Sequence, residues 1–410
     1  MAIGEVSGDS MRIKSLEFYA VRLPFRFAFK HNLASRTFSQ NLVVRAIVTS
    51  DERTEFEGWG ESVPRDYVTG ETTESALLRL KSEYAPRLAN QKFPSPNEVI
   101  RTLKDEFYDL GLDERPLGAS WCALELAVLD AVARANSLIL SRWLSRNDRQ
   151  EVEAGVVYGG VLPFASARIL PLALWLYRFY GFKTVKLKVG ENLEDDLARV
   201  KKARAVLGDG VTLRVDANAA WTVDRTMRFA ERARPFKVVS IEQPVAASDL
   251  EGLAKLSSSL PEQIVADESL CTVSQAQTLA YEKIVSGFNI RLSKVGGFLA
   301  ACEIAEIGRR AGIALHLGAQ VGESGILSAA GRAFAQAQGP FENCEGSANF
   351  FLLKQDLTKE NLTTGLGGFG KPISKPGLAV TVPPKKLNDL VVDRQTEIKN
   401  GSSRNALMRC

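Results

Sequence analysis

Four short segments between residues 211 and 297 decide the fold: LRVDAN at 213–218, SIEQP at 240–244, VADES at 265–269 and NIRLSKVGG at 289–297. The first three each carry an acid after a short apolar run, and Asp216, Glu242 and Asp267 are 26 and 25 residues apart. One strand and one helix of a parallel sheet take roughly 25 to 30 residues, because the crossover needs a dozen or more. The carboxyl ends of successive parallel strands lie at one edge, so the three carboxylates are predicted to converge. In a (β/α)8 barrel this end carries the chemistry.

The chain around these segments is predicted to form an α/β fold of the (β/α)8 TIM-barrel type. From about residue 152, apolar strand patterns alternate with helical ones without interruption. The expected strands cover 153–159, 185–190, 212–217, 238–243, 263–267, 287–293, 313–318 and 342–345. A Rossmann sheet is the alternative, but no Gly-x-Gly-x-x-Gly follows a strand and six strands are usual there. The barrel is favoured.

At 410 residues the chain exceeds what one hydrophobic core usually serves, so a second, smaller domain is expected. Strand patterns followed by helical ones predict an N-terminal α+β domain at 13–140, with a loop between its first two strands at 24–40. The barrel is expected at 150–350. The remaining parts are a flexible leader at 1–12, a segment at 351–396 that returns to the first domain, and a disordered tail at 397–410.

Composition excludes several classes of function. The net charge is only +4, and no run of Lys and Arg indicates a nucleic-acid partner. No apolar run is long enough for a membrane span, and the N-terminus lacks the pattern of a secretory signal. The five cysteines show neither paired nor metal-ligand spacing, which favours reduced thiols in a cytoplasmic protein.

Three converging carboxylates predict a site for a hard divalent cation, because oxygen ligands suit Mg²⁺ and, as an alternative, Mn²⁺. Softer metals would require His or Cys ligands. The chain has two histidines, and only His316 lies in the predicted barrel.

Lysines supply the second half of the predicted chemistry. Lys186 and Lys188 are two residues apart on one strand, so both side chains point to the same side. Two adjacent ammonium groups favour loss of a proton from one of them, which would make Lys188 a general base. Lys294 is expected on the sixth strand, opposite Lys188 on the second. A carboxylate substrate held between them could lose its α-proton, with the metal stabilising the resulting enediolate.

Five motifs stand in this order along the chain: KLKVG, DAN, IEQP, ADES and LSKVGG. Together they resemble the enolase superfamily, specifically its muconate-lactonizing-enzyme subgroup. The resemblance spans nearly the whole chain, and it implies a modified enolase-like barrel with an N-terminal capping domain that the C-terminal segment completes. It implies Mg²⁺ ligands at Asp216, Glu242 and Asp267, and acid/base lysines at Lys188 and Lys294. It also implies supporting roles for Lys186, Asn218 and Glu268, and a homo-oligomer that acts on a small carboxylate.

The resemblance leaves the reaction open between a cycloisomerase and an epimerase or racemase. Dipeptide epimerases, N-acylamino acid racemases and o-succinylbenzoate synthases are alternatives, as is a barrel that binds a carboxylate without turning it over. Dipeptide epimerases carry Asp-x-Asp where this chain has Glu345-Gly346-Ser347, whereas muconate cycloisomerases carry a single Glu. The further candidates for substrate contact are Glu345, Glu323 and, on a loop predicted to be exposed, Arg65 and Tyr67.

Overall fold

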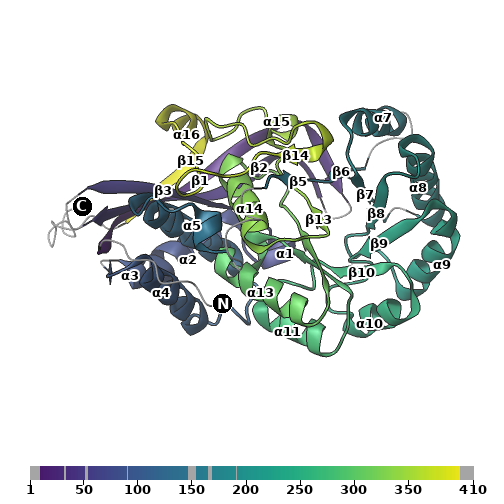
Figure 1. Cartoon of the computed structure of the whole chain (residues 1–410), viewed down its shortest axis with the longest axis horizontal. Coiled ribbons are helices and arrows are strands. Elements are labelled where there is room, and N and C mark those ends of the chain that lie inside the picture. The colour runs from purple at the N-terminus through teal and green to yellow at the C-terminus, as the bar shows by residue number, and fades with distance from the viewer. Residues whose placement is uncertain are drawn as a thin grey trace, which may run out of the picture.

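The computed structural model describes residues 10–31, 34–50, 54–89, 91–145, 154–164, 169–190 and 192–397. In Figure 1 the antiparallel sheet and its helices form the left part of the molecule. A curled parallel sheet ringed by helices forms the right part. No helix among the described residues is long and apolar enough to cross a membrane.

The antiparallel sheet has the order β15-β1-β2-β3, formed by β1 (Met11–His31), β2 (Ala34–Ser50), β3 (Glu55–Ser62) and the C-terminal β15 (Val391–Glu397). The short β4 (Lys92–Phe93) also pairs with β1. The prediction of a loop at 24–40 is wrong. The strands β1 and β2 continue through this segment as a hairpin, with Phe29 paired to Arg36. Of the predicted leader, residues 1–9 lie outside the described residues, but Met11 and Arg12 already belong to β1. The predicted tail also lies outside them, apart from Glu397 in β15.

Helices cover one face of this sheet: α1 (Asp66–Thr69), α2 (Thr73–Arg79), a π-helical turn (Leu80–Tyr84), α3 (Ala85–Leu88), α4 (Pro96–Asp109), α5 (Gly118–Ala135) and α6 (Leu140–Trp143). The central one, α5, is buried over almost its whole length. It approaches β3 so closely that a Cβ on Gly58 would lie 2.1 Å from the Ala131 nitrogen, and one on Gly60 would lie 2.0 Å from the Ala123 oxygen. Glycine is therefore required at both positions.

Eight parallel strands form the second sheet, in the order β13-β12-β11-β10-β9-β8-β7-β6. They are β6 (Gly160–Leu162), β7 (Thr184–Lys188), β8 (Thr212–Asp216), β9 (Val238–Glu242), β10 (Gln263–Ala266), β11 (Gly287–Ile290), β12 (Ala314–Leu317) and β13 (Asn343–Cys344). The curled sheet closes where Tyr158 bridges Cys344, with the Gly159 amide donating to the Cys344 carbonyl at 2.8 Å. The predicted α/β fold with a TIM-type barrel is confirmed.

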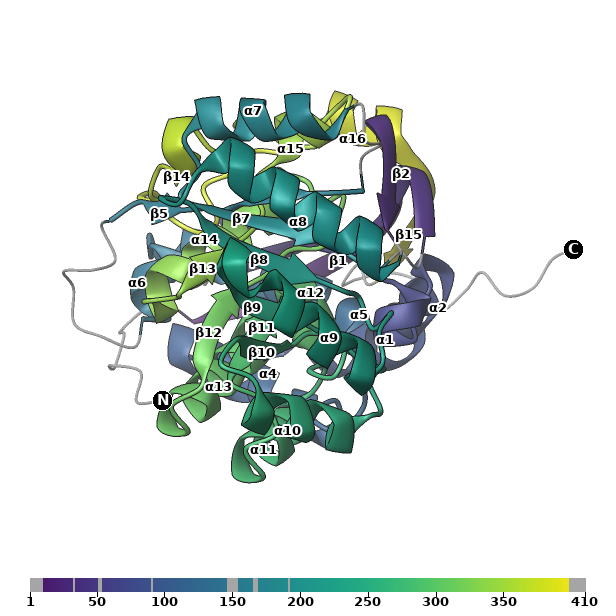
Figure 2. The ribbon, with the colours of Figure 1, turned by 90° about the vertical axis from the view of Figure 1, so that its right-hand side faces the viewer.

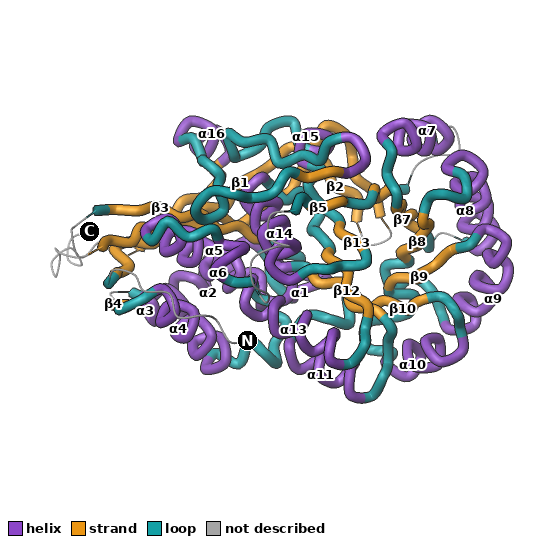
Figure 3. Tube along the Cα trace, in the orientation of Figure 1, coloured by secondary structure: helices purple, strands orange, loops and turns teal. Residues whose placement is uncertain are grey.

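Outside the strands lie α7 (Leu170–Tyr180), α8 (Leu193–Leu207), α9 (Val223–Ala233), α10 (Leu250–Ser259), α11 (Val273–Tyr281), α13 (Phe298–Arg310) and α14 (Gly325–Gln338). Figures 2 and 3 show this outer row from two directions. Short elements complete the chain: a 3₁₀ turn (Arg234–Phe236), α12 (Leu292–Val295), α15 (Asn349–Leu352), a 3₁₀ turn (Leu366–Gly368) and α16 (Pro384–Leu390).

Two predicted barrel strands need correction. The first was expected at 153–159, but the strand beside β7 is β6 at 160–162. The preceding β5 (Val156–Val157) instead pairs antiparallel with β14 (Phe369–Gly370), a partner far along the chain that local periodicity cannot reveal. The sixth was expected to reach residue 293, but β11 ends at Ile290 and the chain turns into α12.

Candidate metal and acid/base centre

The candidate site consists of two layers of side chains inside the barrel, set by strand register. Lys188, Asp216 and Glu242 are paired across β7, β8 and β9, at the carboxyl ends of these strands. Two residues earlier, Lys186 is paired with Arg214, and Arg214 with Ser240. Because side chains alternate along a strand, positions two apart both face the barrel interior.

Asp216, Glu242 and Asp267 form the acidic cluster of the upper layer. They are fully buried, and one carboxylate oxygen from each lies within 4.8 Å of the others. Gln243, at φ 35°, holds the third acid in place, because its Oε1 accepts from the Asp267 amide at 2.9 Å and from the Ser269 amide at 3.1 Å. The predicted convergence of the three carboxylates is thus present in the fold.

The two β7 lysines share Asp216, which lies 3.5 Å from Lys186 Nζ, but their shortest contacts are to different groups. Lys186 Nζ lies 2.8 Å from Glu242 Oε1 and 2.7 Å from Glu345 Oε2, and these carboxylates outweigh burial and raise its pKa. Lys188 Nζ donates to Asp216 Oδ2 at 2.5 Å and to Asn218 Oδ1 at 2.7 Å. The carboxylates around Lys186 therefore balance the charge that it places beside Lys188.

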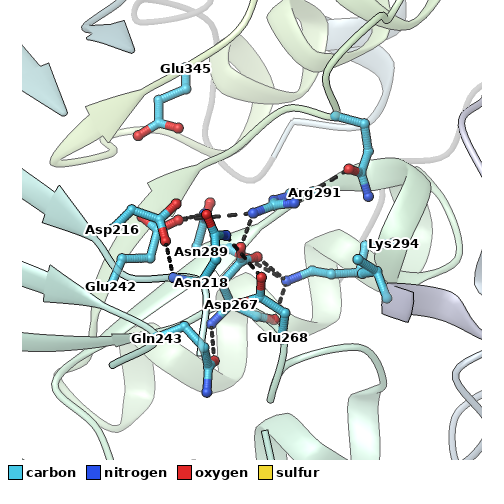
Figure 4. A network of polar contacts seen from close by, with 12 residues as sticks. Asp216, Asn218, Glu242, Gln243, Asp267, Glu268, Asn289, Arg291, Lys294 and Glu345 are labelled. Atoms are coloured by element: carbon cyan, nitrogen blue, oxygen red, sulfur yellow. Dashed lines mark hydrogen bonds and ion pairs between the residues drawn. The ribbon is translucent and has the colours of Figure 1, made fainter. Parts of the chain in front are cut away.

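Lys294 reaches the cluster from the side of Asp267 and Glu268, as Figure 4 shows. It lies on α12, after the sixth strand rather than within it as predicted. Its side chain is fully buried and donates to the Asp267 carbonyl at 2.5 Å, to Asp267 Oδ1 at 2.8 Å and to the Asn289 carbonyl at 3.0 Å. Burial lowers the pKa of Lys294 to about 7, which suits a group that gains and loses a proton near neutral pH.

Asn218 and Glu268 extend the network beside the cluster. Asn218 Nδ2 donates to Glu268 Oε1 at 3.0 Å, while its own backbone amide donates to Asp216 Oδ1 at 2.9 Å. Burial raises the pKa of Glu268, and the neighbouring Asp216 carboxylate adds to the rise. The second carboxylate oxygen of Glu268 is buried without a hydrogen-bond partner among the described residues.

Sequence reasoning missed two arginines in this site. Arg214 lies in the lower layer, donating to Glu345 Oε1 at 2.8 Å and to Glu242 Oε2 at 3.2 Å. Arg291 follows β11, forms an ion pair with Asp267 and donates to Gln320 Oε1 at 3.3 Å. Strand alternation could have found Arg214, since it stands two residues before Asp216. Arg291 carried no such signal, because its direction depends on the turn into α12.

Glu345 directly follows β13, and Glu323 lies in the loop between β12 and α14. Lys186 and Arg214 outweigh the effect of burial and lower the pKa of Glu345. Glu323 accepts from the Gln320 amide at 2.6 Å, and burial raises its pKa to about 8. Both line a cavity of about 10 Å³, which has room for about one water.

Arg65 does not lie on an exposed loop as expected, while its predicted contact with the substrate stays a prediction. Its side chain is 5% exposed, and its guanidinium donates to the Pro64 carbonyl at 3.0 Å, the Ser39 hydroxyl at 2.9 Å and the Val321 carbonyl at 3.1 Å. Arg65 therefore ties the first domain to the loop after strand seven. Tyr67, on α1, is 38% exposed, with the Arg36 guanidinium 5.9 Å from its ring centre.

The donor set fits a hard divalent cation. All three candidate ligands are carboxylates, and the orphaned oxygen of Glu268 adjoins them. Each acid is also faced by an ammonium group on a flexible stem, namely Lys186, Lys188 or Lys294. Such side chains can shift when a cation enters, whereas a fixed backbone donor cannot.

The sequence matches the family model described as Enolase C-terminal domain-like over residues 172–386. It is 30% identical to muconate cycloisomerase 1 of Pseudomonas putida over 308 residues, which cover 73% of this chain and 78% of the relative. Among solved structures, it is similar to the N-succinyl Arg/Lys racemase of Bacillus cereus (TM-score 0.84, 25% identity, 94% and 100% of the two chains). It is also similar to the dipeptide epimerase of Enterococcus faecalis complexed with Mg and L-Leu-L-Tyr (TM-score 0.80, 25% identity, 90% and 99%). The chain belongs to the enolase C-terminal domain-like family, within the muconate-lactonizing branch of its isomerases.

Proposed function

We propose that this isomerase is a Mg²⁺-dependent racemase or epimerase that moves the proton α to a substrate carboxylate. The observation that carries the proposal is the placement of two buried lysines on opposite sides of one acidic cluster: Lys188 comes from β7 and Lys294 from α12. Removal of a proton from one face and its return to the other requires a group on each side.

Asp216, Glu242 and Asp267 would hold the cation, which, when bound, would orient the substrate carboxylate and stabilise the negative charge that develops on it. The dipeptide epimerase of Enterococcus faecalis, crystallised with Mg, supports the choice of metal. Lys188 would act on one face of the α-carbon and Lys294 on the other. Asn218 would position the Lys188 ammonium, to which its side chain is bonded at 2.7 Å.

The substrate proposed is a carboxylate without the free N-terminal ammonium of a dipeptide, such as an N-acylated amino acid. A dipeptide epimerase would need acids at both Glu345 and Ser347 to hold that ammonium. Here Glu345 already binds Lys186 at 2.7 Å and Arg214 at 2.8 Å, and Ser347 is a neutral acceptor for Arg332 at 3.0 Å. The similarity to an N-succinyl Arg/Lys racemase points the same way.

A cycloisomerase is the second candidate, and the specific observation in its favour is the single acid at 345. The relative from Pseudomonas putida is a muconate cycloisomerase, and this subgroup has one Glu at that place. Two lysines are compatible with this reaction, but it needs proton transfer on one face only.

The test is mass spectrometry of substrates incubated with the enzyme in D2O and Mg²⁺. The panel comprises N-succinyl and N-acetyl amino acids, the corresponding free dipeptides and muconate. Deuterium at the α-carbon of the acylated substrates, lost on adding EDTA, is the expected result. Faster exchange into free dipeptides would overturn the substrate class, and lactone formation from muconate without exchange elsewhere would select the cycloisomerase. No exchange and no lactone with any of them would sink the proposed reaction.

A further inference from the structure

The outer face of α7 is unusually apolar for a barrel helix. Five large side chains are exposed there: Ile169 by 58%, Leu172 by 61%, Trp175 by 55%, Leu176 by 50% and Phe179 by 72%. Residues three and four apart lie on one side of a helix, so the five form a single stripe. Figures 1 and 2 both place α7 at the edge of the molecule.

The barrel itself does not need this stripe. The opposite side of α7 makes the contacts that hold the helix, since Leu170 and Leu174 are buried and the Tyr177 hydroxyl donates to the Val161 carbonyl at 2.7 Å. The neighbouring α8 shows the ordinary arrangement, with exposed charged residues such as Lys201 and Lys202 on its outer face. Fold stability therefore gives no reason for apolar residues on the outside of α7.

The α7 stripe carries no charge. Arg178 is the one charged residue of the helix, and its guanidinium is directed to the Val206 carbonyl at 2.7 Å, over the end of α8. On the stripe, the Trp175 and Phe179 rings stack with centroids 5.6 Å apart and an interplanar angle of 12°. Depletion of charge and enrichment in aromatic residues are typical of the centre of a protein–protein interface.

The exposed area is close to what a stable dimer uses. If a large apolar residue presents roughly 200 Å² when free, the five side chains together expose about 600 Å². Leu366 (70% exposed) and Phe351 (43% exposed) adjoin the helix through Tyr180, whose ring lies 5.6 Å from Phe351 and whose hydroxyl bonds the Thr364 carbonyl. With them the patch reaches about 800 Å², the area that one partner buries in a standard interface and more than monomers usually expose.

We propose that this surface is where two copies of the chain meet, with α7 packed against α7 of the partner about a two-fold axis. A two-fold interface sets a patch against itself, so the patch must complement its own chemistry. An apolar surface without charge meets this condition, whereas a charged one would repel its copy. The last described strand, β15, lies on the other domain, away from α7 (Figure 1), so it does not cover the stripe.

The experiment is sedimentation velocity of the full chain across a dilution series. The wild type is expected to dimerise reversibly. Replacing Trp175→Glu and Phe179→Glu together puts charges on both sides of the interface and should weaken association by at least about thirtyfold for each aromatic anchor lost. The control is Leu78→Glu, which adds one charge of the same sign at a side chain of α2 that is 65% exposed, and should dimerise as the wild type does.

A second measurement needs no variant. Hydrogen exchange in residues 169–180 of the wild type should slow as the protein concentration rises, while exchange in α8 stays constant. A wild type that remains monomeric throughout the series overturns the proposal. Dimerisation that survives the double substitution, with concentration-independent exchange in α7, places the interface elsewhere and also overturns it. Both outcomes are independent of the reaction that the enzyme catalyses.

Discussion

Two groups of buried carboxylates in this molecule have different partners. In the barrel, Asp216, Glu242 and Asp267 face lysine side chains at 2.5 to 2.8 Å. Between the two domains, Glu61 and Glu125 face backbone amides instead. Glu61 accepts from the Ser324 and Leu327 amides of α14, both at 2.9 Å, and Glu125 accepts from Phe298 and Leu299 at the start of α13.

The partners decide what each group can do. The first amides of a helix have no partner within it and carry partial positive charge, so Glu61 and Glu125 satisfy them and bind the first domain to the barrel. In this arrangement both carboxylates are paired with backbone donors, whose positions the helices fix. Lysine ammonium groups lie on flexible stems and exchange protons, so the barrel carboxylates stay available to a cation and the lysines to a substrate. The effects on the pKa differ as well: Lys186 and Arg214 overcome burial and hold the pKa of Glu242 at about 2, whereas burial raises the pKa of Glu61 to about 7 and that of Glu125 to about 8.

The largest effect is expected from removing the lysines of the barrel group. Lys188→Met and Lys294→Met should each lower the rate of racemisation by about 10²- to 10⁴-fold, because each removes one of the two acid/base groups that the reaction needs. Mg²⁺ binding, measured by calorimetry, should persist. The matched control is Lys202→Met on the exposed face of α8. Full activity in both site variants would contradict the assignment of the two lysines.

Removal of one candidate ligand should abolish the linkage between metal and stability. In the wild type, Mg²⁺ at a hundred times its Kd should raise the free energy of unfolding by about 2.7 kcal/mol. Asp216→Asn should lose most of this gain, because the amide replaces a charged ligand oxygen. The comparison is Asp209→Asn, which makes the same change at a carboxylate with a side chain 68% exposed. Denaturant titrations with and without Mg²⁺ measure both, and an unchanged Mg²⁺ effect in Asp216→Asn would refute the metal site.

The interdomain group should affect stability without affecting the metal. Glu61→Gln would place an NH2 group opposite either the Ser324 or the Leu327 amide donor, so the free energy of unfolding at pH 8 should fall by about 1–3 kcal/mol. Glu55→Gln, at an exposed site on the same strand, should leave it unchanged. Reduced Mg²⁺ affinity in folded Glu61→Gln would erase the distinction between the two groups.

The smallest effect, taken per pH unit, concerns pH. Burial raises the pKa of Glu125 to about 8 from its ordinary 4.5, so between these values the folded protein binds more protons than the unfolded chain. The contribution of Glu125 is complete below pH 4.5 and is lost as the pH rises through about 8, by at most about 1.4 kcal/mol per pH unit. Glu125→Gln should remove this slope, because an amide side chain does not titrate. The fold should tolerate the change, since the amide oxygen can still accept from the Phe298 amide. Denaturation at several pH values gives the slope for both proteins, and equal slopes would contradict the raised pKa.

The sequence by itself determined the repeating strand-helix unit and the convergence of three acids. These features are local: an acid after each short apolar run, at the spacing of one β/α unit, must reach the same end of a parallel barrel. The same reasoning gave the shared direction of Lys186 and Lys188.

Tertiary structure alone decided the remaining features, because they depend on contacts between residues far apart in the chain. The direction of Arg291 follows from the turn after β11, and Arg65 is buried because it bonds Val321, 256 residues away. Glu61 lies in a strand that reads as ordinary, yet it caps a helix 263 residues later. The outer side of α7 could not be identified from its sequence either, since an almost wholly apolar helix does not reveal which face the barrel buries.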